Sequence, residues 1–281
     1  MNPVAPEEAL ADVVSAHDEV PIPEQDVAVS HVSHLDEALS AFEEALGLVD
    51  RDEQPAFYGI ILHDIAQTFE VAERFDIAVE LYRESVSFKR RAENLADIST
   101  TLVALAQCLM STGHLDEAFT ALGEAGEALG LAAPGLDTGD LSIRMHEIGL
   151  LYERMGSRGI ASAYDDAITT YRRTLELIDE ETDPKSYASV LRGIGDVYCA
   201  TGQLRDSASA YAEAVSLLRT TDEQNGLAST LIDLGRTKRR LAEMDGQRFL
   251  DVDAAPRLAA GRQEEEDVGR AEVEDASPRP E

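Results

Sequence analysis

One short run of residues occurs twice in the sequence, and the distance between its copies constrains the fold more than any other feature. The run His34-Leu35-Asp36-Glu37-Ala38 recurs as His114-Leu115-Asp116-Glu117-Ala118, which is 80 residues later. Ala78 stands halfway between the two alanines, so the implied period is 40 residues. A fixed period of about 20 to 50 residues is the signature of an array of stacked repeats.

A second pattern predicts the first helix of each repeat, called helix A here. It places a large apolar residue four positions before a small one, and this spacing puts both residues on one stripe of a helix. The small residues are 40, 43, 46 and 40 positions apart along the chain. The successive pairs are Leu62 and Ala66, Leu102 and Ala106, Met145 and Gly149, Leu191 and Gly195, and Leu231 and Gly235.

A third pattern predicts the second helix of each repeat, called helix B. A small residue is followed by a ring or a leucine four positions later and by another small residue after three more: Ala38/Phe42/Ala45, Ala78/Tyr82/Ser85, Ala118/Leu122/Ala125, Ala167/Tyr171/Thr174 and Ser207/Tyr211/Ala214. Breakers such as Gly113 and Gly202 separate helix A from helix B. The small residue of helix A lets helix B approach, and the ring of helix B fills the space beside it. Each hairpin then needs a neighbour to bury its apolar face.

These residues resemble the tetratricopeptide repeat (TPR), whose signature has the same spacings in both helices. The resemblance covers residues 32–246 and implies an all-α fold, a right-handed α-α superhelix of stacked helix hairpins. The period of 40 rather than about 34 residues is similar to the long-helix variant of kinesin light chains and bacterial regulators. A hydrophobic content of 44% with only 5% aromatic residues also favours closely packed helices. The unit at 157–164 carries extra residues and is irregular.

The ends and one internal segment depart from the repeat pattern. Residues 1–31 contain several acids and prolines and no lysine or arginine, so we expect a largely flexible acidic arm. Residues 129–141 include Pro134 and two glycines and are expected to form a linker within the array. Residues 247–281 are predicted to be an acidic, disordered tail.

The acidic composition limits the choice of partners. The formal net charge is -31, which disfavours binding to nucleic acid or to an anionic membrane surface. This acidity fits a salt-adapted cytosol or an arginine-biased genome equally well. No secretory leader or membrane span is expected, and the two cysteines, Cys108 and Cys199, belong to no metal-binding or redox motif. We therefore expect a cytoplasmic protein with two small, buried thiols.

The resemblance implies that the protein is an adaptor that binds a protein or peptide in the concave groove lined by helix A. Two alternatives remain open: a ligand-sensing module that changes its curvature when a peptide binds, and a structural scaffold that associates with itself. The groove residues carried over from the resemblance are His63, Gln67, Gln107, His146, Arg192, Asp196, Arg236, Arg239 and Arg240.

The arginines near the end of the array allow two interpretations. Arg236, Arg239 and Arg240 either pair with nearby acids and with the end of a helix, or contact a ligand. A related hypothesis, based on charge complementarity, is that the acidic tail folds back onto these arginines.

Enzymatic chemistry is not expected. The sequence contains no glycine-rich phosphate loop, no nucleophile elbow and no HExxH motif. His31 and His34 have a spacing that can chelate a metal on a helix, but no third ligand accompanies them. The sequence therefore predicts neither a cofactor nor a metal site.

Overall fold

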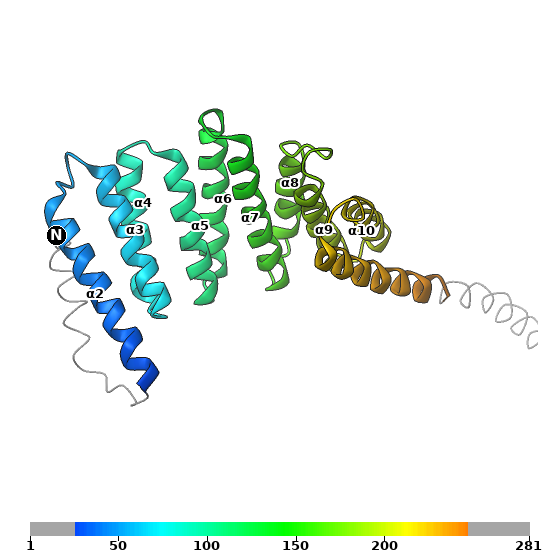
Figure 1. The fold of residues 1–281 in the computed structure, drawn as a ribbon, viewed down its shortest axis with the longest axis horizontal. Coiled ribbons are helices and arrows are strands. Elements are labelled where there is room, and N and C mark those ends of the chain that lie inside the picture. The colour runs from blue at the N-terminus through cyan, green and yellow to red at the C-terminus, as the bar shows by residue number, and fades with distance from the viewer. Residues whose placement is uncertain (1–25, 247–281) are drawn as a thin grey trace, which may run out of the picture. The chain divides into compact units, whose positions relative to one another are not determined.

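The computed structural model describes residues 26–246, which fold into consecutive helices with short connections (Figure 1). Within this range no strand is present. The all-α prediction is confirmed. The elements are α2 (Asp26–Leu48), α3 (Pro55–Val71), α4 (Phe75–Arg91), α5 (Leu95–Ser111), α6 (Leu115–Ala132), the 3-10 turn η2 (Ala133–Gly135), α7 (Thr138–Ser157), α8 (Ala163–Leu175), α9 (Pro184–Ala200), α10 (Leu204–Leu218) and a last described helix at 224–246.

The chain divides into two compact units, which are described separately. Unit 1 ends at Asp179 and holds α2 to α8, whereas unit 2 begins at Glu180 and holds α9, α10 and the helix at 224–246. In unit 1 each helix packs on the next one in the chain, and Figure 1 shows α3 to α6 side by side in chain order. Helix pairs α3–α4, α5–α6 and α7–α8 are the predicted hairpins, as is α9–α10 in unit 2.

The contact predicted between the small residue of helix A and the ring of helix B is present. A Cβ atom built on Gly149 would lie 2.5 Å from the ring of Tyr171, and one built on Gly195 would lie 2.6 Å from the ring of Tyr211. Tyr171 is completely buried and Tyr211 nearly so. These two glycines are therefore required by the close approach of the rings.

The turns inside the regular hairpins follow one path. Gly113 (φ 84°) and Gly202 (φ 79°), the predicted breakers, take the left-handed conformation, and Glu73 (φ 57°) holds the equivalent position in the first hairpin. The next residue closes the turn onto a carbonyl of helix A, as when the His114 amide donates to the Leu109 oxygen at 2.9 Å. The α7–α8 connection is longer, at residues 158–162, and lies in the segment predicted to be irregular.

The segments expected outside the repeats fare differently. Helix α2 begins at Asp26, so the end of the expected 1–31 arm is helical. The rest of that arm (1–25) and the tail (247–281) lie outside the described residues. The expected linker at 129–141 holds the end of α6, the turn η2 and the start of α7. There Asp137 caps α7 by accepting hydrogen bonds from the amides of Gly139 and Asp140, at 2.9 and 3.4 Å.

Candidate functional site

A cavity of about 280 Å³ opens on the helix A side of unit 1 and is lined by three successive A helices, α3, α5 and α7. We call it the helix-A cavity. Its wall is mixed in character, with amide, hydroxyl, imidazole and charged groups beside a few small apolar side chains. The lining residues are His63, Gln67, Ser99, Thr100, Val103, Ala104, Gln107, Arg144, Glu147 and Ile148.

Two hydrogen-bonded links tie α7 to α5 along this cavity. Nη1 of Arg144 donates to Oγ1 of Thr100 at 2.6 Å and to the carbonyl oxygen of Ala96 at 3.4 Å. Nε2 of Gln107 donates to Oε1 of Glu147 at 3.2 Å. The partners of Arg144 are both neutral, so its charge is fixed in place by hydrogen bonds with uncharged groups.

His63 forms the inner edge of the cavity. The side chain is 9% exposed and its ring centroid lies 5.3 Å from that of Tyr82 in α4. Burial, assisted by the positive charge of Lys89, lowers the pKa of His63 to about 4. The imidazole is therefore neutral near pH 7, and its buried Nδ1 atom has no hydrogen-bond partner.

A buried lysine lies close to His63. Lys89 is 3% exposed, and its ammonium group donates to Oγ1 of Thr101 at 2.8 Å. Burial lowers the pKa of Lys89, while the charges of Asp97 and Asp64 oppose this effect. Gly59 makes room for the lysine, since a Cβ atom there would come within 2.9 Å of Lys89 Cγ.

His146, the other histidine expected in the groove, occupies the repeat position equivalent to His63 but does not line this cavity. Its ring centroid lies 5.7 Å from that of Tyr171 in α8, at an interplanar angle of 70°. Burial lowers the pKa of His146. Both histidines thus pack against the ring of their own helix B, and only His63 lines the cavity.

The remaining predicted groove residues lie in unit 2, where each has a partner. Arg192 and Arg236 both approach the Asp233 carboxylate, at 3.3 and 3.6 Å. The hydroxyl of Tyr211 donates to Oδ1 of Asp196 at 2.5 Å. Burial raises the pKa of Asp196, although this bond and Arg192 oppose the rise.

The two arginines that follow on the last described helix also have partners. Arg239 lies 3.8 Å from Glu243, and Nη1 of Arg240 lies 3.0 Å from the sulfur of Cys199. Cys199 is only half-buried, whereas Cys108 is fully buried as predicted. Pairing of Arg236 and Arg239 with nearby acids is thus present in unit 2, and the hypothesis that the tail contacts these arginines involves residues outside the described range.

Comparison with solved structures places this arrangement. BtubC (BKLC) from P. vanneervenii superimposes with a TM-score of 0.58 and 19% identity, over 89% of this chain and 95% of that one. A Podosopora anserina protein described as a kinesin light chain with nearly identical TPR-like repeats gives a TM-score of 0.53 and 15% identity, over 68% of this chain and 90% of that one. The fold is that of TPR-like repeats. A scan against protein-family models and a search of curated proteins each found no match.

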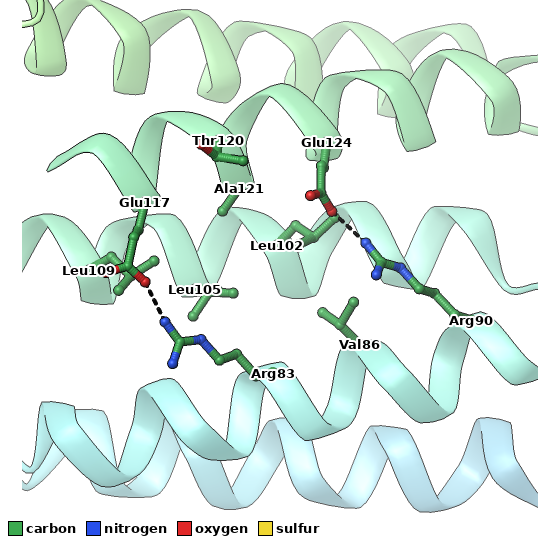
Figure 2. A pocket seen from close by; sticks show the side chains of 10 residues that line it. All are labelled: Arg83, Val86, Arg90, Leu102, Leu105, Leu109, Glu117, Thr120, Ala121 and Glu124. Atoms are coloured by element: carbon green, nitrogen blue, oxygen red, sulfur yellow. Dashed lines mark hydrogen bonds and ion pairs between the residues drawn. The ribbon is translucent and has the colours of Figure 1, made fainter. Parts of the chain in front are cut away.

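The TPR-like array has a second cavity, of about 350 Å³, on its helix B side, which we call the helix-B cavity. Figure 2 shows that α5 supplies an apolar floor with Leu102, Leu105 and Leu109, between the walls formed by α4 and α6. Two ion pairs cross the opening. Arg83 pairs with Glu117 at 2.5 Å, and Arg90 pairs with Glu124. Exposed pairs of this kind contribute little stability, about 1 kcal/mol or less each. Here they join each charged residue that lines the helix-B cavity to one of opposite charge on the facing wall.

Two residues that line the helix-A cavity, Arg144 and Glu147, are not among the predicted groove residues. Most of the predicted groove residues lie at the helix A positions of His63 and Gln67, whereas the cavity also uses the position of Ala104 and Glu147, two before the small residue. Because these equivalent positions both face the cavity, a wider stripe on helix A would have found Glu147. The position of Arg144 in α7 corresponds to that of Thr101 in α5, which is buried. The repeat pattern therefore gives no signal that Arg144 lines the cavity.

In the described part of the chain, no group of three potential metal ligands lies together. His34 is exposed and lies 3.6 Å from Glu37. None of the helices from α2 to residue 246 is long and apolar enough to cross a membrane.

Proposed function

We propose that this protein is an adaptor that binds a protein or peptide on its helix A face and catalyses no covalent reaction. The observation that carries the proposal is the helix-A cavity, in which three consecutive A helices converge on one space of about 280 Å³. A bound chain would therefore contact several repeats at once. Such a surface holds a ligand through shape and polar contacts.

The cavity wall has the chemistry that an extended peptide needs. The side-chain amides of Gln67 and Gln107 each offer a donor and an acceptor, which match a peptide group. His63 is neutral near pH 7 and adds an uncharged imidazole. Arg144 adds a positive charge that is held in place by Thr100 and Ala96.

The proposal extends to the equivalent face of unit 2, which holds Arg192, Asp196 and Arg236. There the pairing of both arginines with Asp233 means that a ligand would have to compete for them. We therefore assign the main contacts to unit 1. The cytoplasmic location expected from the sequence belongs to the same proposal.

Selection from a displayed library of random peptides tests the assignment. Peptides selected on the wild-type protein should bind the double variant Gln67→Ala/Gln107→Ala about tenfold more weakly, because two hydrogen-bonding amides are lost. Thr120→Ala, which changes the helix-B cavity, is the matched control and should bind as tightly as the wild type. Unchanged binding by the double variant, or a selection that enriches no peptide, would contradict the proposal.

A further inference from the structure

The described chain starts with the second half of a hairpin and finishes with the first half of another. Helix α2 carries the helix B pattern, with Ala38 and Phe42, but no helix A precedes it within residues 26–246. The helix at 224–246 carries the helix A pattern, with Leu231 and Gly235, and no helix B follows it in the same range. The two ends are therefore complementary halves of one repeat.

The stripes that hairpins normally bury are open at both ends. In the complete hairpin α3–α4, Ala78 and Tyr82 are 0% exposed, whereas the equivalent Ala38 and Phe42 of α2 are only half-buried. The same contrast holds for helix A. Leu231 is 40% exposed, while its counterparts in α3, α5 and α9 are buried.

The space beside Gly235, which we call the notch, is filled by no residue of the described range. In α9 a Cβ atom on Gly195 would meet the ring of Tyr211, but a Cβ atom on the equivalent Gly235 would meet nothing within 4 Å. A glycine inside a helix reduces stability by about 0.5–1 kcal/mol relative to alanine. Among residues 26–246, the close packing that explains Gly195 is thus absent around Gly235.

The adjoining sequence does not supply the missing halves in register. The hairpin turn 201–203 corresponds to residues 241–243, and these continue the last described helix. Beyond them, Gln247 and Asp251 stand where a helix B needs a small residue and a ring. At the other end, α2 is helical through residues 32–34, where the turn after a helix A would lie, and Asp26 stands where that helix A needs its small residue.

A groove is already present where the missing first helix would lie. It has a volume of about 340 Å³ and runs between α2 and α3, with Leu35, Ala38 and Phe42 on one side and Gln67, Thr68 and Val71 on the other. Val71 is 74% exposed, although it is apolar. Within the part of the chain that the structure describes, the groove is thus an apolar surface that a helix would cover.

The two open surfaces also differ in charge. Helix α2 contains no lysine or arginine, and its acids include Asp36, Glu37, Glu43 and Glu44, all exposed. The last described helix carries four exposed basic residues, Arg236, Lys238, Arg239 and Arg240, against three acids, Asp233, Glu243 and Asp245, so it is slightly basic in a chain whose net charge is -31. Opposite charges on two surfaces attract them over about a Debye length and fix their orientation.

We propose that the occupant of each open end is a second copy of this chain. The helix at 224–246 of one molecule lies against α2 of the next, with the ring of Phe42 in the notch at Gly235, and the two helices complete a hairpin across the interface. The contact joins unlike surfaces, so each molecule keeps one free end and association continues head to tail. This interaction is independent of peptide binding in the helix-A cavity.

Sedimentation velocity of the full chain over a wide concentration range tests the proposal. The weight-average mass of the wild type should rise with concentration, and salt should weaken the association. Gly235→Gln fills the notch, and Ala38→Gln blocks the groove, so each variant alone should remain a monomer. Gly126→Gln, in open space on α6, and Ala41→Gln, on the exposed side of α2, are matched controls and should associate like the wild type.

Mixing the two blocked variants gives the sharpest result. Each retains the end that the other has lost, so an equimolar mixture of Gly235→Gln and Ala38→Gln should form a dimer and nothing larger. A symmetric contact between like ends would instead leave one variant self-associating when alone. Circular dichroism of each variant shows whether its helices are intact.

Three outcomes would overturn the proposal. One is a wild-type mass that stays at the monomer value at every concentration. Another is association that survives either blocking substitution. The third is a wild-type monomer that associates only after residues 1–25 or 247–281 are deleted, which would assign the open surfaces to the chain's own termini.

Discussion

The same substitution at two equivalent glycines should have opposite effects on stability. Gly195 and Gly235 hold the same position in successive A helices, and both lie in unit 2. Alanine at Gly195 would place its methyl group 2.6 Å from the ring of Tyr211, whereas alanine at Gly235 would enter open space. Tyr211 cannot easily move aside, since it is 2% exposed and its hydroxyl is hydrogen-bonded to Asp196.

The magnitudes follow from two effects. Alanine favours an α-helix over glycine by about 1 kcal/mol, and this gain applies at both sites. Overpacking a filled site costs about 1–3 kcal/mol, and this penalty applies only at Gly195. We expect Gly235→Ala to raise the free energy of unfolding by up to about 1 kcal/mol, and Gly195→Ala to lower it by up to about 2 kcal/mol. The difference between the variants, about 1–3 kcal/mol, measures the ring contact.

Urea unfolding followed by far-ultraviolet circular dichroism, on dilute protein, is the appropriate assay. Because both residues lie in unit 2, the two variants report on the same part of the chain. If Gly195→Ala were stabilised as much as Gly235→Ala, the ring would not be in contact with the glycine, and the pairing of helix A with helix B argued here would be wrong.

Three further predictions concern single residues. The pKa of His63 is about 4 in the folded chain and about 6.5 in the unfolded chain, so protonation at low pH favours the unfolded chain. Relative to His63→Gln, the wild type should lose about 2 kcal/mol of unfolding free energy between about pH 7.5 and pH 5. If urea unfolding gave both proteins the same change of free energy with pH, the prediction would be wrong. Glu93 has a φ of 55°, so Glu93→Gly should raise the melting temperature through a gain of about 0.5–1 kcal/mol, and a lower melting temperature would refute the strain. Lys89→Met should be at least as stable as the wild type near pH 7, because it removes a buried ammonium group whose pKa is lowered by burial. Its advantage should shrink as the pH rises toward the pKa of about 10.5 in the unfolded chain. A large loss of unfolding free energy in chemical denaturation would show that the hydrogen bond to Thr101 outweighs the cost of burial.

The hairpins were predictable because their signal is repeated. Pairs such as Gly195 and Tyr211 recur at fixed spacing, and each recurrence tests the same packing rule. The turn at Gly113 was equally predictable, since glycine adopts a positive φ without strain. Glu73 takes the same conformation without any such signal in its side chain.

The candidate site was only partly predictable. His63, Gln67 and Gln107 line the helix-A cavity as the position in helix A suggested, but His146 does not. Equivalent positions differ here, since His63 and Val103 line the cavity and His146 does not, so the repeat position alone does not decide which side chains reach it. The hydrogen bond between Arg144 and Thr100 joins two different helices, α7 and α5, and no spacing in the sequence predicts such a contact.

The packing of each helix on its sequence neighbours also affects how the chain folds during its synthesis. Hairpin α3–α4 joins residues that lie close together in sequence, and its next contacts, with α5, follow directly in the chain. Structures dominated by such local contacts form quickly, because little loop entropy is lost before the contacts are made. The early hairpins of unit 1 can therefore close while the ribosome is still adding α9 and α10. The order of synthesis and the order of folding then coincide.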